Sequence, residues 1–203
     1  MKIICIGRNY RKHIEELNNE RPISPVIFIK PDSSVILKNQ PFFIPDYSKD
    51  VHYEAEVILK ICKLGKSIDK KFAHKYYNKI SLGIDFTARD IQNELKIKGL
   101  PWEKSKAFDG SALIGEWIDK TEFNDINNLN CTLKKNGDNA QLGNTSNMLW
   151  SIDELVSEIS RFFTLKIGDV IFTGTPSGVN RVFENDLFEG FIENKNVFNV
   201  NIK

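Results

Sequence analysis

VHYEAEVILKI, residues 51–61, has the alternation of a β-strand with one buried face. Strand side chains point alternately to opposite faces, so one face collects the apolar residues Val51, Tyr53, Ala55, Val57, Leu59 and Ile61. His52, Glu54 and Glu56 share the other face. Two carboxylates one pleat apart repel each other, which is costly unless a cation or a proton lies between them. The segment therefore predicts a strand that packs on a core and presents two acidic side chains to a cation.

Asp85 is a third candidate ligand, because it follows the apolar run ISLGI and precedes an expected helix, and such junctions often carry functional residues. Oxygen ligands without cysteine favour Mg²⁺, Mn²⁺ or Ca²⁺ over zinc. Three carboxylates would leave about three of six octahedral positions for water and substrate. The Glu-x-Glu spacing alone also fits a solvated strand face. His52 fits a structural role as well as a ligand role and is left out of the metal set.

Composition excludes several classes of function. The 203 residues are 41% hydrophobic and 27% charged, an ordinary globular balance, and a net charge of +1 gives no basic footprint for nucleic acid. The N-terminus turns polar too early for a signal peptide, and no apolar run is long enough to span a membrane. Cys5, Cys62 and Cys131 form no CxxC pair, which favours free thiols. We expect a cytoplasmic protein with no nucleic-acid or membrane partner.

Short periodic segments predict a strand-dominated α+β fold, a roll or barrel with helices on its outside, in one continuous domain over residues 1–203. The expected strands are residues 26–29, 51–61, 80–86, 131–134, 170–173, 188–192 and 197–202. Four helices are expected. The first covers residues 9–17 with Asn9 as its N-cap, and the second begins at Ser67 and carries Ile68, Phe72 and Tyr76 on one face. The third begins at Thr87, with Asp90 as its capping partner, and ends at Gly99, and the fourth begins with a Ser151–Glu154 capping box.

Seven motifs in register carry a resemblance to a known family. They are GRNYRKH at the start, YEAEV, GIDFTARDIQ, KGLPW, KSKAFDG, GNTSNM and FTGTPSGV, in that order. Together they span nearly the whole chain, which resembles the short form of the fumarylacetoacetate hydrolase family. Within the family it is similar to acylpyruvase and oxaloacetate decarboxylase proteins and to 2-hydroxyhepta-2,4-diene-1,7-dioate isomerases.

The resemblance implies a fold like the fumarylacetoacetate hydrolase C-terminal domain, a rolled β-barrel with peripheral helices, and a homodimer. It also implies a set of site residues, each carried over by motif: Glu54, Glu56 and Asp85 as ligands of Mg²⁺ (or Mn²⁺), His13 and Glu16 as a water-activating pair, Lys106 as a cation near the metal, and Arg89, Gln92 and Thr175 as substrate contacts. Leu113 and Asn147 depart from the family pattern, which has proline and aspartate there in many members, and neither departure falls on a proposed ligand.

These residues also fit a non-functional interpretation, as ordinary solvent-exposed side chains. Lys106 lies among lysines that are mostly exposed in proteins, and His13 with Glu16 also fits an exposed helical pair. With the resemblance, we expect a metal-dependent hydrolase or lyase that cleaves a C–C bond in a small 2-oxo acid, an acylpyruvate or oxaloacetate, through a metal-held pyruvate enolate. The alternatives are an isomerase or tautomerase of a 2-hydroxy-dienoate and, from another class, a non-catalytic metal-stabilised binding module.

Overall fold

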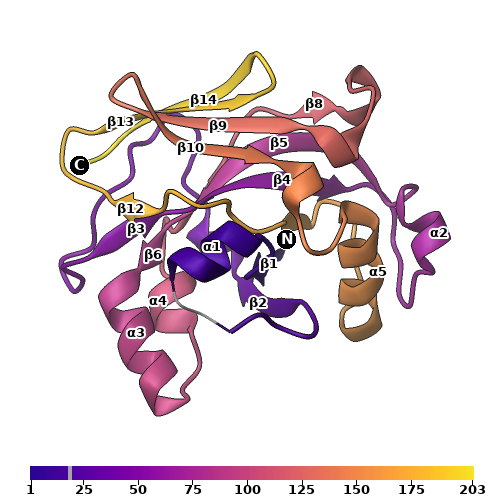
Figure 1. Ribbon diagram of the computed structural model, residues 1–203, viewed down its shortest axis with the longest axis horizontal. Helices are drawn as coiled ribbons and strands as arrows, with labels where there is room; N and C mark the ends of the chain where they lie inside the picture. The colour runs from indigo at the N-terminus through magenta and orange to yellow at the C-terminus, as the bar shows by residue number, and fades with distance from the viewer. Residues whose placement is uncertain (18–19) are drawn as a thin grey trace.

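The structure is a computed structural model that describes residues 1–17 and 20–203. Within these residues the strands form a seven-stranded, a four-stranded and a three-stranded sheet (Figure 1). The strands are β1 (Ile3–Gly7), β2 (Val26–Lys30), β3 (Val51–Tyr53), β4 (Ala55–Ile61), β5 (Tyr77–Asp85), β6 (Thr87–Ala88), β7 (Ala112–Ile114), β8 (Ile118–Asp119), β9 (Asn130–Lys135), β10 (Asp138–Asn144), β11 (Val170–Phe172), β12 (Asn180–Arg181), β13 (Leu187–Ile192) and β14 (Lys195–Asn201). The helices are α1 (Arg11–Glu16), α2 (Lys70–Ala73), α3 (Arg89–Lys98), α4 (Glu103–Lys106) and α5 (Ile152–Phe162).

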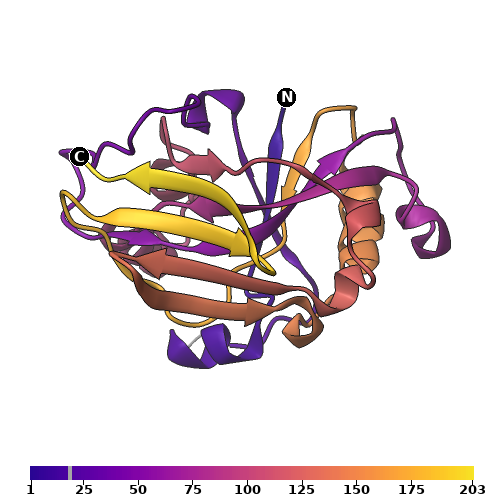
Figure 2. The ribbon, with the colours of Figure 1, turned by 90° about the horizontal axis from the view of Figure 1, so that it is seen from above.

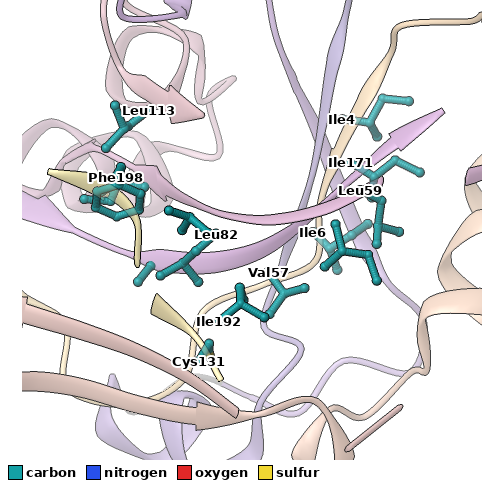
Figure 3. Packing of buried hydrophobic residues seen from close by; sticks show 14 of the residues in the cluster. Ile4, Ile6, Val57, Leu59, Leu82, Leu113, Cys131, Ile171, Ile192 and Phe198 are labelled. Carbon is teal, nitrogen blue, oxygen red and sulfur yellow. The ribbon is translucent and has the colours of Figure 1, made fainter. Parts of the chain in front are cut away.

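The largest sheet has the strand order β2-β1-β11-β4-β5-β7, and β8 also pairs with β5. The second sheet, β10-β9-β13-β14, lies as a separate layer beside it (Figure 2). The main core fills the space between the two sheets, where Val57 and Leu82 of the larger sheet lie near Ile192 and Cys131 of the smaller one (Figure 3). Helices lie at the periphery, so the expected strand-dominated α+β fold is confirmed.

The predicted strand over residues 51–61 is interrupted at Glu54, which separates β3 from β4. The apolar face is as predicted, because all of its alternating residues belong to the main core. The interruption lies where the β4–β5 ladder ends at Ala55 and Ile84, and the last contact between the two strands is a hydrogen bond from Asp85 N to the Glu54 carbonyl at 2.8 Å. β3 then turns to a different sheet, between β12 and β6.

Two predicted helices begin later than expected because their expected capping residues bond elsewhere. α1 begins at Arg11, and the Asn9 side chain instead donates to the Thr173 carbonyl at 2.8 Å and accepts from Trp150 N at 2.9 Å. α3 begins at Arg89, and Thr87 lies in β6. Asp90 accepts hydrogen bonds from Ser48 Oγ and Lys49 N rather than capping with Thr87. The predicted end of α3 at Gly99 is confirmed, with a φ of 62°.

The helix predicted from Ser67 is wrong in extent, and the one predicted from Ser151 is right. α2 is a single turn capped by Asp69, because Ser67 has a φ of 50°, outside the right-handed helical region. Ser67 N and Ile68 N instead donate to Ser160 of α5. α5 has the predicted capping box, in which the Glu154 carboxylate accepts from Ser151 N at 2.8 Å. Its apolar stripe is fully buried at Ile152, Leu155, Val156 and Ile159.

Several short or central strands lie outside the predicted set, most notably β1 and β10. β1 occupies the middle of the large sheet, parallel to β11 and antiparallel to β2. Within the described residues no helix combines the length and the apolar character needed to cross a bilayer. All three cysteines are free thiols, as predicted, and Cys5 and Cys131 are buried.

Candidate active site

Three carboxylates converge where β4 and β5 end. Glu54 lies just before β4, Glu56 is its second residue, and Asp85 is the last residue of β5. The antiparallel register pairs Glu56 with Gly83 and Ala55 with Ile84, which brings the ends of the two strands together. One ligand oxygen from each carboxylate lies within 4.8 Å of the others, and all three side chains are buried.

Lys106 and Arg89 contact these acids from two helices. Lys106 at the end of α4 donates to Asp85 Oδ2 at 2.7 Å, to Glu54 Oε2 at 2.9 Å and to Thr87 Oγ1 at 2.6 Å. Arg89 at the start of α3 donates through Nη2 to Glu54 Oε1 and through Nη1 to Gln92 Oε1. Lys106 is 3% exposed, so it is not one of the solvated lysines that its sequence neighbourhood also fits.

Lys30, the last residue of β2, also contacts this cluster. The sequence did not predict it as a site residue. Its ammonium is fully buried and donates to Lys106 O, to Ser111 O at 3.0 Å and to Ser111 Oγ at 2.9 Å. The same ammonium forms a buried ion pair with Asp85 Oδ1, 2.7 Å away. A lysine that closes the apolar run Val26–Lys30 is the sequence signal for this group.

The protonation preferences of the acids differ sharply. Burial alone would raise the pKa of Glu54, but the charges of Lys106 and Arg89 outweigh it and hold that pKa well below its usual range. Burial, followed by repulsion from Asp85 and Glu54, raises the pKa of Glu56 well above its usual range. Burial opposes the charge of Lys106, but Asp85 and Glu54 raise its pKa. Of the three acids, Glu56 is the one that forms no ion pair with a described residue, and the charge of Lys106 does not outweigh burial and repulsion there.

The donor set fits a hard divalent cation. It consists of carboxylate oxygens with no sulfur or imidazole among the three clustered groups. The Glu56 carboxylate, with its raised pKa and no ion pair among the described residues, is the anion that a cation would satisfy. Glu56 Oε2 is held in place by Gly174 N, which donates to it at 2.6 Å.

His13 and Glu16 reach the same pocket from α1. A hydrogen bond joins His13 Nδ1 to Glu16 Oε2 at 3.2 Å, and Glu16 Oε1 accepts from Gly178 N at 2.9 Å. Burial would raise the pKa of Glu16, but its hydrogen bonds with His13 and Gly178 lower it. A carboxylate that accepts from Nδ1–H leaves Nε2 as the basic nitrogen of the ring. His13 is 6% exposed, so the pair is not simply an exposed helical pair.

The pocket between these groups encloses about 430 Å³ of space outside the protein atoms, including its open mouth. All the predicted site residues except Glu16 line it, and Glu16 contacts His13 at its edge. Further lining residues that the sequence argument did not assign are Ile6, Gly7, Arg8, Leu17, Phe28, Lys96 and Trp102. Arg8 belongs to the quoted GRNYRKH motif, which is the signal that could have found it.

Thr175 lies in the pocket wall, but its hydroxyl already has two partners. It donates to Ala55 O at 2.8 Å and accepts from Gln141 Nε2 at 2.9 Å, so a ligand would meet other atoms of this residue. The two departures from the family pattern lie elsewhere. Leu113 is a core residue of β7 paired with Ile84, and Asn147 belongs to a 3₁₀ turn, Thr145–Asn147, beside Tyr10.

Comparison with known proteins identifies a matching family and its relatives. The sequence profile described as fumarylacetoacetate (FAA) hydrolase C-terminal matches residues 2–203. The mitochondrial oxaloacetate tautomerase of Bos taurus is 39% identical over 91% of this chain and 83% of its own length. The mitochondrial oxaloacetate decarboxylase of Dictyostelium discoideum is 42% identical over 89% of this chain and 84% of its own.

A solved structure gives the same result at the level of the fold. The fumarylpyruvate hydrolase from Pseudomonas aeruginosa, solved in complex with Mn²⁺ and pyruvate, superimposes with a TM-score of 0.93. It is 32% identical, and the superposition covers 100% of this chain and 89% of that one. From the profile match, these relatives and the shared fold, the chain belongs to the fumarylacetoacetate hydrolase family.

Proposed function

We propose that this chain is a divalent-cation-dependent enzyme that cleaves a C–C bond in a small 2-oxo acid, either an acylpyruvate or oxaloacetate. The observation that carries the proposal is the placement of a buried histidine base, His13, in the same pocket as three buried carboxylates and two buried cations. A module that only bound metal would not need a base beside the acids. The family's relatives that act on oxaloacetate and fumarylpyruvate support the substrate class.

Glu54, Glu56 and Asp85 would hold Mg²⁺ or Mn²⁺, and the relative crystallised with Mn²⁺ and pyruvate supports this choice. When bound, the cation would supply a Lewis acid for the 2-oxo and carboxylate oxygens of the substrate. Lys106 would add a fixed positive charge where the enolate oxygen develops. Arg89, oriented by Gln92, is placed to hold the substrate carboxylate.

His13 would move the proton that each reaction requires. In hydrolysis a water attacks the distal carbonyl, His13 Nε2 takes its proton, and the pyruvate enolate that leaves is protonated at C3. Glu16 orients the ring through Nδ1 and stabilises its protonated form. In decarboxylation carbon dioxide leaves and the same enolate is protonated at C3, so no attacking water is consumed.

Tautomerisation is a second candidate, favoured by the relatives that are oxaloacetate tautomerases. It would use the same enolate with every C–C bond intact, because His13 would carry a proton between C3 and the 2-oxygen. An isomerisation of a 2-hydroxy-dienoate would follow the same proton path. The homodimer and the cytoplasmic location remain predictions beside these reactions.

The test is a substrate panel on the purified chain with Mg²⁺ or Mn²⁺. Acetylpyruvate, fumarylpyruvate and oxaloacetate are incubated with the enzyme, and pyruvate release is measured alongside the keto–enol absorbance of oxaloacetate. Pyruvate formation that requires the added cation supports C–C cleavage. Keto–enol exchange without pyruvate would transfer the proposal to tautomerisation, and no reaction with any of the three would overturn it.

A further inference from the structure

The charge of the chain is distributed unevenly, although its sum is only +1. The connection between β4 and β5, residues 62–76, holds five of the 28 Lys and Arg and one of the 27 Asp and Glu. Its formal charge is therefore four positive, and the remaining residues together are three negative. All five lysines are exposed: Lys63, Lys66, Lys70, Lys71 and Lys75. The average over the whole chain, which predicted no membrane partner, hides this local excess.

This connection lies at the end of the β4–β5 pair that is opposite to the candidate active site. β4 begins beside Glu54 and ends at Ile61, and β5 returns from Tyr77 to Asp85. A strand of seven residues spans about 20 Å, so the connection lies about that far from the carboxylates. α2, which belongs to the connection, protrudes at one edge of the molecule in both views (Figure 1 and Figure 2). A partner bound there would leave the pocket free.

Large apolar side chains are exposed among these lysines. Leu64 is 62% exposed and Phe72 is 45% exposed. The ammonium groups of Lys71 and Lys75 each lie 5.0 Å from the centre of the Phe72 ring. The connection therefore presents cations and apolar groups to solvent side by side.

The end of α5 extends this surface. Gly65 and Leu165 exchange two backbone hydrogen bonds, at 3.0 and 2.8 Å, which hold the chain after α5 against the connection. Phe162 and Ile167, close to Leu165 in the chain, are both exposed. Lys66 donates to the Arg161 carbonyl at 3.0 Å. We call residues 62–76 with Phe162 and Ile167 the lysine-rich end.

We propose that the lysine-rich end docks the chain on a membrane surface that contains anionic lipids. Clusters of about four to eight basic residues are attracted by the negative surface potential of such a membrane. Leucine and phenylalanine side chains beside the lysines can enter the boundary between headgroups and acyl chains. Charge brings the two surfaces together, and the exposed apolar groups then gain a less polar environment.

Two other partners fit these side chains less well. Arginine is the preferred cation for nucleic acid, because its planar guanidinium matches phosphate oxygens, but residues 62–76 contain none. The aliphatic side chains of Leu64 and Ile167 cannot stack on bases as aromatic rings do. A second copy of the chain, related by twofold symmetry through this surface, would place lysines against lysines. Anionic lipid is the partner that suits both the charge and the apolar groups.

The experiment measures co-sedimentation with vesicles of phosphatidylcholine alone and of phosphatidylcholine mixed with phosphatidylserine. The first variant neutralises three lysines of the lysine-rich end by Lys63→Gln, Lys66→Gln and Lys75→Gln. A matched control makes the same change in net charge at three exposed lysines elsewhere, by Lys38→Gln, Lys98→Gln and Lys195→Gln. All of these side chains are at the surface, and melting temperatures confirm that each protein is folded.

We expect the wild type to bind the phosphatidylserine vesicles and not those of phosphatidylcholine. Binding should weaken between about 0.1 M and 1 M salt, because the screening length falls from about 10 to about 3 Å. Each lysine near an anionic surface contributes about fivefold in affinity, so the first variant should bind about a hundredfold more weakly. The control should stay within about twofold of the wild type, because its charges are distant from the lipid and are screened.

A second variant, Leu64→Ser with Phe72→Ser, keeps the charge and removes two exposed apolar groups. It should bind the phosphatidylserine vesicles about tenfold or more weakly than the wild type. A single-stranded RNA oligonucleotide is the competing probe, and we expect it to bind more weakly than the vesicles. Three results would overturn the proposal: no vesicle binding by the wild type, equal losses in the lysine variant and its control, or tighter binding to RNA than to vesicles.

Discussion

The interior behind α5 and the interior around Glu54 bury opposite kinds of side chain. α5 places an apolar stripe, including Leu155 and Ile159, against the core with full burial. The pocket instead buries three carboxylates with Lys30, Lys106 and Arg89 in direct contact. Both regions are buried, yet only the first has a composition that would be chosen for stability alone.

The difference shows what each region contributes. Burying apolar surface stabilises the fold directly. Buried ion pairs often contribute little net stability, because the cost of removing charges from water offsets their attraction. Six charged groups buried together are therefore better explained by function than by stability. We infer that they hold a divalent cation and an anionic substrate.

The sharpest test of this contrast pairs Asp85→Ala with Leu155→Ala. Loss of Asp85 removes a cation ligand, and we expect turnover to fall by more than about a thousand-fold, because the cation supplies several kcal/mol of transition-state stabilisation. Leu155→Ala should lower the free energy of unfolding by about 2–5 kcal/mol and leave kcat of the folded fraction unchanged. Steady-state kinetics and urea denaturation on both variants give the comparison. Comparable kcat in the two would erase the distinction between the regions.

A second prediction concerns His13 within the charged region. His13→Ala should lower acylpyruvate cleavage by about a hundred- to ten-thousand-fold, the usual cost of losing a general base. Decarboxylation should be less affected, since Lys106 and the carboxylates are retained. Glu16→Gln should fall between wild type and His13→Ala, because the imidazole is still present with an altered partner. Both activities are measured at saturating Mg²⁺, and an equally small effect on both would remove the pair from the catalytic set.

Lys30 tests whether the buried charges depend on one another. Lys30→Met leaves Asp85 without one of its two ammonium partners and Ser111 without its donor, so the cation-free protein should lose about 3–5 kcal/mol of unfolding free energy. Lys38→Met, which breaks an exposed pair with Glu116, is the control and should change stability by less than about 1 kcal/mol. Chemical denaturation measures both, and equal losses would show that burial of the Lys30 pair is unimportant.

The contrast between the regions also explains which predictions from the sequence succeeded. The capping box of α5 and the apolar face of residues 51–61 depend on local sequence pattern, and both are confirmed. Thr87 and Asp90 have the residue types of a helix cap, but their side chains form hydrogen bonds with residues distant in sequence. Lys106 donates to Thr87, and Ser48 donates to Asp90. Local patterns cannot reveal such contacts.

The residues of the candidate site also differ in how far the sequence alone predicts them. Glu54, Glu56 and Asp85 follow from strand alternation and a strand end, and the structure brings them together. The resemblance supplied His13, Glu16, Lys106, Arg89, Gln92 and Thr175, which composition and spacing alone could not have separated from solvated residues. Lys30 was missed because a lysine is ordinarily exposed, and only packing from distant segments buries it. Lys96, which lines the pocket but is only half-buried, was missed for the same reason.

The smallest expected effect belongs to the apolar region. Ser151→Ala removes the capping hydroxyl at the start of α5 and should lower the unfolding free energy by about 1 kcal/mol. Ser151→Asn, which can also cap a helix, should restore most of it. Thermal denaturation measures the change, and kcat should be the same in all three proteins. A change in kcat with the cap would mean that the two regions are coupled.

The central claim is that the buried carboxylates hold a divalent cation without which the enzyme does not turn over. The most direct measurement is pyruvate release from acetylpyruvate and oxaloacetate by protein stripped with chelator, before and after addition of Mn²⁺ or Mg²⁺, with melting temperature recorded on the same samples. We predict no turnover in chelator, recovery with either cation, and a rise in melting temperature with Mn²⁺ that Glu56→Ala abolishes. Full turnover in chelator would contradict the account.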